Sequence, residues 1–167
     1  MKKRLTIIQM DVHVNDVEYN YTRVQELLSQ SLSENPDIIV LPETWNTGFY
    51  PSKELINIAD RNGERTQSLL STFAKEHNVN IVGGSVAVAK NDVVFNTSYA
   101  YNREGTLVGE YSKMHGFSPA KEDQYFAGGT HTTHFELDGI PCSTVICYDI
   151  RFPELVRMAA LPNTELL

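Results

Sequence analysis

Three side chains with complementary chemistry follow three separate apolar runs of the sequence. They are the carboxylate of Glu43, the ammonium group of Lys113 and the thiol of Cys147. A thiol can attack a carbonyl carbon, a carboxylate can take and return the proton, and a cation can stabilise the oxyanion that forms. Together the three residues predict the hydrolysis of an amide through a thiol.

Glu43 and Lys113 each follow a predicted strand. The apolar run Ile38–Leu41 has the composition of a fully buried strand, and Pro42 stops it just before Glu43. Leu107–Tyr111 is a second strand-like run and ends shortly before Lys113. Taken alone, Glu43 could cap a loop and Lys113 could be an ordinary solvated lysine.

Cys147 lies between a predicted strand and a predicted helix. Ser143–Ile146 indicates a short buried strand, and Pro153 suits the first position of a helix. The unpaired N–H groups and the positive dipole end of that helix favour a thiolate, so we expect a pKa below the usual value of about 8.5. The alternative is that Cys147 fills the core, as a lone cysteine in a strand often does.

Three ordered blocks of the sequence resemble the signature blocks of the nitrilase superfamily of carbon–nitrogen hydrolases. They are Leu41–Thr44, Tyr111–His115 and Ile146–Glu154, while Val82–Ser85 and Phe95–Thr97 resemble the family's central strands. Residues 41–49 and 113–122 are most similar to the omega-amidase branch, whose members release ammonia from the terminal amide of 2-oxo acids. The resemblance implies hydrolysis of a small-molecule amide; another branch, such as a nitrilase or an N-carbamoyl hydrolase, stays open.

The resemblance also assigns roles to individual residues. Glu43 falls on the general base, Lys113 on the partner of the oxyanion and leaving group, and Cys147 on the nucleophile. Glu122 matches a second glutamate that the family places near the lysine. The backbone N–H of Tyr148, next after the nucleophile, is then expected to be the other donor to the oxyanion.

Two charged or titratable side chains near these blocks could contact a substrate. Arg151 could bind a substrate carboxylate as a two-pronged donor, or it could pair instead with Asp149 or Glu154. His115 belongs to the lysine block and could hydrogen-bond around the site. A histidine held beside the site is the more common case than one that transfers a proton directly.

Aromatic residues could form the wall of the pocket. Residues 45–51 make a turn-rich loop after Glu43, in which Trp45 and Phe49 could either line a pocket or close the core. Gly116 stands where the family usually has leucine. The resemblance therefore suggests that a packing contact at the pocket wall is either missing or replaced by Phe117.

The family continues with further strands and helices beyond the point where this sequence stops. Residues 163–167 resemble the start of the next strand. The resemblance predicts that residues 1–167 are the N-terminal portion of one longer domain, truncated at its C-terminus. A catalytically inactive fragment or a binding module is the alternative to an enzyme.

The order of the apolar patterns predicts an α/β fold. The expected elements are a strand at 5–10 buried on both faces, a helix carrying Val17, Tyr21, Val24 and Leu28 with Asn15 or Asp16 as its N-cap, the strand at 38–41, a helix at 69–77, a strand at 80–88 and a hairpin of 93–101 and 106–111. The hairpin makes part of the sheet antiparallel. The family resemblance implies that mixed sheets pack face to face in a four-layer αββα sandwich.

Composition argues against several classes of partner. The 167 residues carry 14 basic and 21 acidic side chains, a net charge of −7, which disfavours nucleic acid and anionic membranes. No run approaches the about 20 apolar residues of a membrane span, and Leu5–Met10 is too short for a signal-peptide core. Cys142 and Cys147 are badly placed for a disulfide, which predicts a reducing, cytoplasmic setting. The family resemblance adds a homodimer as the expected assembly.

No metal and no cofactor are expected. His131 and His134 are three residues apart, a spacing that chelates metals on a helix, but glycines precede them and a strand-like run follows. A Gly-rich phosphate loop ahead of a helix is absent from the sequence, so a nucleotide is not indicated.

Overall fold

The computed structural model describes residues 2–161 and 163–167. Its helices are α1 (Val17–Ser31), α2 (Leu55–Ile58), α3 (Glu64–His77), α4 (Glu122–Tyr125) and α5 (Pro153–Ala160). Its strands are β1 (Leu5–Ile7), β2 (Ile38–Val40), β3 (Asp60–Arg61), β4 (Asn80–Val82), β5 (Val86–Lys90), β6 (Val93–Tyr101), β7 (Leu107–Ser112), β8 (His134–Leu137) and β9 (Ile140–Ser143). Short 3-10 helices join them: η1 (Leu32–Glu34), η2 (Ser118–Ala120) and η3 (Cys147–Arg151).

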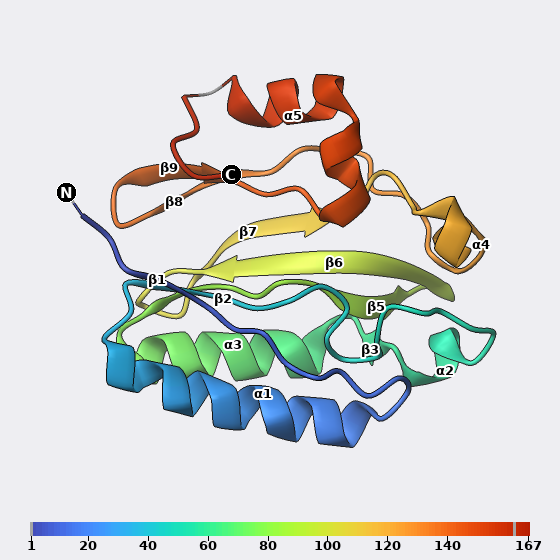
Figure 1. Ribbon diagram of the computed structural model, residues 1–167, viewed down its shortest axis with the longest axis horizontal. Coiled ribbons are helices and arrows are strands. Elements are labelled where there is room, and N and C mark those ends of the chain that lie inside the picture. The colour runs from blue at the N-terminus through green and yellow to red at the C-terminus, as the bar shows by residue number, and fades with distance from the viewer. Residues whose placement is uncertain (1, 162) are drawn as a thin grey trace.

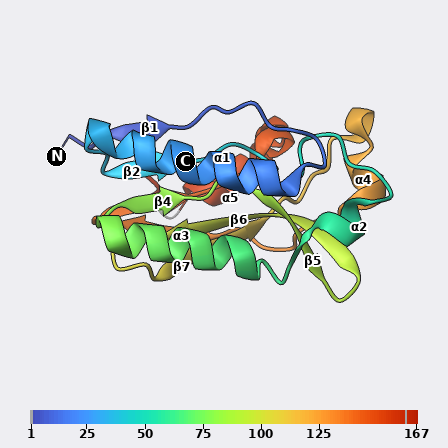
Figure 2. The same cartoon turned by 90° about the horizontal axis from the view of Figure 1, so that it is seen from below.

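These elements form four layers in the order helix, sheet, sheet, helix (Figure 1). Helices α1 and α3 lie side by side on one face of the large sheet (Figure 2). The hairpin of β8 and β9 lies over the opposite face, and α5 lies outside it (Figure 1). The predicted α/β fold with a four-layer αββα arrangement is confirmed.

The large sheet is mixed, as predicted. Its order is β1-β2-β4-β6-β5-β3, and β7 also pairs with β6. Strands β1, β2 and β4 are parallel, whereas β6 is antiparallel to β4, β5 and β7. The long strand β6 pairs with β5 near its start and with β4 near its end, so it joins the two halves of the sheet.

The core lies on both faces of the large sheet. Tyr21, Val24 and Leu28 recur at helical spacing on α1 and are buried against the sheet, and the side chain of Asp16 caps the helix, as the sequence predicted. A second apolar cluster fills the space between the two sheets; it contains Ile38, Ala100, Phe135, Leu137 and Cys142. The helix predicted at 69–77 is present as α3, which ends at His77 as predicted but begins five residues earlier, at Glu64.

Strand β1 differs from its prediction. It covers only Leu5–Ile7, and the two ends are exposed, Leu5 by 40% and Ile7 by 70%. The apolar composition of this run suggested burial on both faces, but β1 is the first strand in the sheet order and pairs only with β2. A strand with one neighbour in the sheet leaves more of its side chains in solvent.

The strand predicted at 80–88 is two strands, β4 and β5, which occupy different places in the sheet. The chain breaks at Gly83 and Gly84. Gly84 has φ +58°, and a Cβ atom there would lie 2.0 Å from the carbonyl oxygen of Pro42. Only glycine fits this close approach of two backbones, so the pair of glycines ends β4 and redirects the chain.

Strands β2, β7 and β9 lead into the three residues singled out by the sequence. Glu43 lies three residues past β2, Lys113 directly follows β7, and Cys147 lies four residues past β9. The strand predicted at 143–146 was therefore placed too late, because β9 ends at Ser143. Within the described residues, no helix combines the length and apolar character that a bilayer crossing requires.

Candidate active site

Lys113 is buried between two carboxylates. Its Nζ atom donates to Glu43 Oε1 at 2.8 Å and to Glu122 Oε2 at 2.7 Å. The side chain of Lys113 is 3% exposed and that of Glu122 is 1% exposed. A cation at this depth is tolerated only with close, hydrogen-bonded counter-charges, and the two glutamates supply them.

The charge of Lys113 is fixed by these partners. Burial lowers the pKa of Lys113, but the hydrogen bonds and negative charges of Glu122 and Glu43 outweigh it, so the pKa is raised above the ordinary value of 10.5. Lys113 is therefore an ammonium group at any physiological pH. A permanent cation next to a nucleophile can stabilise an oxyanion.

Cys147 opens the 3-10 helix η3 with its backbone in the left-handed region, at φ +47°. Its thiol is free, and the residue is exposed. Partial burial of the thiol, followed by the negative charge and hydrogen bonding of Glu43, raises the pKa of Cys147, and the charge of Lys113 only partly opposes this.

The expectation of a lowered pKa for Cys147 is therefore wrong. The α-helix predicted to face the thiol is α5, which does begin at Pro153, but that helix start lies six positions past Cys147, beyond the 3-10 helix η3. Partial burial of the thiol is the largest cause of the raised pKa, and the negative charge and hydrogen bonding of Glu43 come next. The resting form is a thiol, so it needs a base to remove its proton.

Asn96 holds the Glu43 carboxylate and was missed as a site residue. It lies on β6, is fully buried, and donates from Nδ2 to Glu43 Oε1 at 3.0 Å. The available signal was a run of polar residues, Asn96, Thr97 and Ser98, inside a strand that is otherwise apolar. Buried polar side chains of this kind require partners and often belong to sites.

Glu122 joins the lysine to the loop that precedes α4. The Oε2 atom that binds Lys113 also accepts the backbone N–H of Phe117 at 2.6 Å. The residue before Glu122, Lys121, has φ +59°, so a tight turn delivers the glutamate into the site. A cavity of about 190 Å³ borders Lys113 and Glu122 on this side.

His115 is turned toward a second buried carboxylate. Asp149 Oδ1 lies 2.9 Å from His115 Nδ1, and the imidazole stacks on Phe152 with 3.6 Å between ring centroids. Asp149 was noted in the sequence only as a possible partner of Arg151. Arg151 is exposed and has no ion pair within residues 2–161 and 163–167, so neither of the predicted pairings with Asp149 or Glu154 is formed.

Trp45 and Phe117, two of the aromatic residues considered for the pocket wall, lie in different places. Trp45 is fully buried, donates from Nε1 to Gly83 O at 2.9 Å and packs edge-on against Tyr21, so it closes the core and does not line a pocket. Phe117 is half-buried. It packs edge-on against Tyr148, the residue after the cysteine, with 5.1 Å between ring centroids.

The described residues offer no cluster of three metal-ligating side chains. His131 and His134, the pair tested in the sequence, are both exposed, and His134 begins strand β8. Residues three apart on an extended chain point to opposite faces, which is unsuitable for chelation.

The sequence of the chain matches the model of the carbon–nitrogen hydrolase family over residues 4–167. The chain belongs to this family. It is 41% identical over 167 residues to 2-oxoglutaramate amidase of Bacillus subtilis (strain 168), a match that covers all of this chain and 64% of that protein. It is 30% identical over 172 residues to omega-amidase NIT2 of Homo sapiens, which covers 98% of this chain and 61% of that protein.

Solved structures share the fold of this chain. XC1258 from Xanthomonas campestris, a CN-hydrolase superfamily protein with an arsenic adduct in its active site, has a TM-score of 0.81 at 30% identity, over 91% of this chain and 56% of that one. An amidase from Nesterenkonia sp. has a TM-score of 0.86 at 20% identity, over 98% of this chain and 63% of that one. The present chain thus spans less than two thirds of the length of these proteins.

Proposed function

We propose that this carbon–nitrogen hydrolase cleaves a small-molecule amide to an acid and ammonia through a thioester on Cys147. The observation that carries the proposal is the placement of Lys113 between Glu43 and Glu122. The charge and hydrogen bonding of Glu43 also raise the pKa of the Cys147 thiol. A nucleophile, a base and a cation are the three groups that amide hydrolysis through a thiol requires. Membership of the family supports the same reading.

In the first half of the proposed reaction, Glu43 takes the proton of the Cys147 thiol while the sulfur attacks the amide carbon. The negative charge that develops on the amide oxygen is stabilised by Lys113 Nζ and by the backbone N–H of Tyr148. The C–N bond then breaks, and the nitrogen leaves as ammonia with the proton that Glu43 returns. The acyl group stays on sulfur as a thioester.

In the second half, Glu43 takes a proton from water, and the resulting hydroxide attacks the thioester carbon. The oxyanion again forms beside Lys113. The C–S bond breaks, the acid leaves, and the sulfur regains its proton from Glu43. Glu122 keeps Lys113 in place, and Asn96 keeps the Glu43 carboxylate in place, throughout both halves.

For the substrate we propose the terminal amide of a 2-oxo acid, such as 2-oxoglutaramate. The support is the 41% identity to a 2-oxoglutaramate amidase and the 30% identity to an omega-amidase. Such a substrate carries a carboxylate, and Arg151 is an exposed guanidinium four residues past Cys147 that has no ion pair in the described part of the chain. We assign it the binding of that carboxylate.

For the assembly we propose a homodimer, and for the location the cytoplasm. The end of the chain exposes large apolar side chains, among them Ile150, Met158 and Leu161, which supports burial against a second copy. Cys142 and Cys147 are both free thiols, as expected in a reducing compartment. Sedimentation velocity tests the first proposal, and a monomer at micromolar concentration would contradict it.

Ammonia release from 2-oxoglutaramate by this 167-residue chain tests the proposal. Cys147→Ala should abolish release without lowering the melting temperature. Cys142→Ala is the matched control, because Cys142 is a buried free cysteine on β9 and should be dispensable for turnover. Full activity of Cys147→Ala, or an inactive wild-type chain, would contradict the proposed function. A nitrile and an N-carbamoyl compound, assayed in parallel, distinguish the other branches of the family.

A further inference from the structure

Asp149 is a fully buried carboxylate with four hydrogen-bond donors around it. Its Oδ2 atom accepts the hydroxyl of Tyr111 at 2.7 Å and the backbone N–H of Ile146 at 3.1 Å. Its Oδ1 atom lies 2.9 Å from both the backbone N–H and the Nδ1 atom of His115. An ionised carboxylate has about four acceptor positions, so this one is fully used.

The four donors come from the two segments that carry the proposed lysine and cysteine. Tyr111 and His115 lie two residues before and two residues after Lys113. Ile146 directly precedes Cys147, and Asp149 itself follows the cysteine by two residues. One carboxylate therefore binds both sides of the lysine segment and closes the turn around the cysteine.

The turn around Cys147 needs such a bond. A non-glycine residue at φ +47° is held in a sparsely populated conformation, which persists only when surrounding contacts enforce it. The bond from Ile146 N–H to Asp149 spans the cysteine and enforces this backbone. Burying a carboxylate that has no lysine or arginine partner is costly, and four donors are an arrangement that offsets this cost.

We propose that Asp149 is a positioning residue that fixes the Cys147 sulfur relative to Lys113 and Glu43. The inference rests on the proposed function, in which Cys147 is the nucleophile. Asp149 does not contact the reacting atoms in this proposal. It acts through Tyr111 and His115 on one side and through the backbone of the cysteine turn on the other.

Two variants and one control test the proposal. Asp149→Asn removes the charge and half of the acceptor capacity, whereas Tyr111→Phe removes one donor and leaves the charge of Asp149 in place. Tyr99→Phe is the control, because Tyr99 is equally buried on the neighbouring strand β6 and its hydroxyl has no partner within the described residues. The measurements are kcat and KM for 2-oxoglutaramate, melting temperature, and the rate of Cys147 alkylation by iodoacetamide against pH.

A displacement of the sulfur by about 1 Å can cost about 100-fold in rate. We therefore expect kcat to fall about 100-fold in Asp149→Asn and about 10-fold in Tyr111→Phe, with KM changed less than about threefold. The midpoint of alkylation should also shift to lower pH in both variants. Partial burial and the nearby Glu43 carboxylate raise the pKa of Cys147, and a turn that is no longer fixed would move the thiol away from both. Tyr99→Phe should match the wild type in both readouts.

The alkylation midpoint decides the inference independently of turnover. A midpoint that stays at its wild-type pH in Tyr111→Phe, even if the melting temperature falls, would show a merely structural role and overturn the proposal. If the wild-type chain released no ammonia but the midpoint still shifted, the proposed function would fail while the positioning role of Asp149 stood. Tyr111→Phe carries the test alone if Asp149→Asn does not fold.

Discussion

Two clusters of charge lie at opposite ends of the same three strands, β2, β7 and β9. The Arg103 cluster precedes these strands and consists of Lys3, Asp37, Arg103 and Asp138. The Lys113 cluster consists of Glu43, Lys113 and Glu122. Glu43 and Lys113 follow β2 and β7, and Cys147 follows β9. Each strand therefore leads from an ion pair into one residue of the candidate site.

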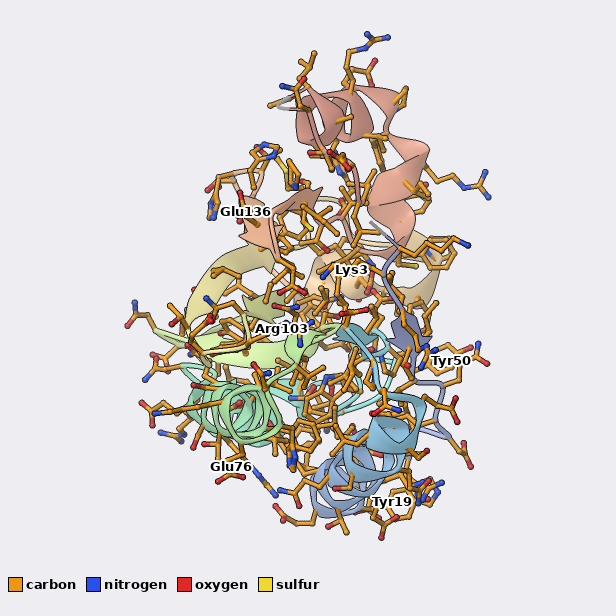
Figure 3. All side chains as sticks on the ribbon, turned by 90° about the vertical axis from the view of Figure 1, so that its left-hand side faces the viewer. Lys3, Tyr19, Tyr50, Glu76, Arg103 and Glu136 are labelled. Carbon is orange, nitrogen blue, oxygen red and sulfur yellow. The ribbon has the colours of Figure 1, made fainter. Side chains whose placement is uncertain are left out.

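The Arg103 cluster is balanced and partly open to solvent. Arg103 donates from Nε and Nη2 to the two oxygens of Asp138 at 2.8 and 2.7 Å and from Nη2 to Asp37 at 2.9 Å, while Lys3 binds Asp138 at 2.8 Å. Lys3 and Arg103 are labelled in Figure 3. Two cations meet two anions, and the pairs tie the turn of the β8–β9 hairpin to the large sheet.

The Lys113 cluster is unbalanced and more deeply buried at its centre: Lys113 and Glu122 are 3% and 1% exposed, whereas Glu43 keeps 20% of its side chain exposed. One cation meets two carboxylates, and the Oε1 atom of Glu122 has no hydrogen-bond partner among the described residues. Such an arrangement is expensive to bury, and an apolar pair would fold more easily. In this chain the charges that tie the hairpin to the sheet are balanced, whereas the candidate site surrounds one deeply buried cation with an excess of acceptor atoms.

Lys113→Met should give the largest effect, because it removes the cation of the Lys113 cluster. It leaves two carboxylates together without their cation, so we expect kcat to fall at least about 1000-fold and the free energy of unfolding to fall by about 3–5 kcal/mol. Ammonia release and urea unfolding measure the two losses. The double variant Lys113→Met/Glu122→Met should regain part of the stability and none of the activity; equal stability of the single and double variants would argue against charge repulsion as the cause.

Two buried asparagines allow a matched test of the two ends. Asn96 donates to Glu43 and Asn80 donates to the carbonyl oxygen of Asp37, and the Oδ1 atom of each is buried without a partner in the described chain. Substitution by leucine should cost each protein about 1 kcal/mol of stability. Only Asn96→Leu should also lose kcat, about 10-fold or more, because the base is no longer held. Comparable kcat losses in both variants would refute the division between the two ends.

Much of the site could be predicted because it lies at strand ends. The apolar runs before Glu43 and Lys113 are local patterns, and the ordered blocks around them resembled a family whose fold is confirmed here. The roles of Asn96 and Asp149 could not be read in the same way. Their partners lie 53 and 38 residues away, Glu43 for Asn96 and Tyr111 for Asp149, and no local pattern specifies such long-range hydrogen bonds.

The errors have a common physical cause, which is tertiary context. The sequence left Trp45 open between a pocket wall and the core, and only the buried carbonyl oxygen that its indole N–H contacts decides for the core. The pKa of Cys147 is raised by partial burial and by Glu43, which lies in the segment after β2, more than 100 residues away in sequence. The two glycines, Gly83 and Gly84, are present in the sequence and indicate a break. The sequence does not show that the backbone at Pro42 approaches them closely.

Arg103→Met should lower stability and leave activity almost unchanged, in contrast to Lys113→Met, which should lower both. It removes the bidentate pair with Asp138 and the bond to Asp37, so we expect a loss of about 1–2 kcal/mol, kept small because solvent screens the cluster. Ammonia release should stay within about twofold of the wild type, because the cluster lies at the far end of the strands. Arg103→Lys should recover little of the stability, since lysine lacks the planar fork; full recovery would point to charge alone.

Asp138→Asn should give the smallest effect, and the pH dependence of that effect separates the charge of Asp138 from the shape of its side chain. The hydrogen bonds of Arg103, opposed by burial and supported by Lys3, hold the pKa of Asp138 well below its ordinary value of 3.8. A carboxyl whose pKa is lowered by folding adds stability above its unfolded pKa and loses it as pH falls toward the folded pKa. The free energy of unfolding of the wild type should therefore exceed that of Asp138→Asn by about 1 kcal/mol at pH 7, and the excess should shrink as pH falls below about 4.

Urea unfolding from pH 7 to pH 3 measures this excess. Both proteins keep the Lys113 cluster, so the titration of that cluster cancels in the difference. An excess that stayed constant over this range would mean that the shape of the side chain, and not its charge, ties the hairpin to the sheet.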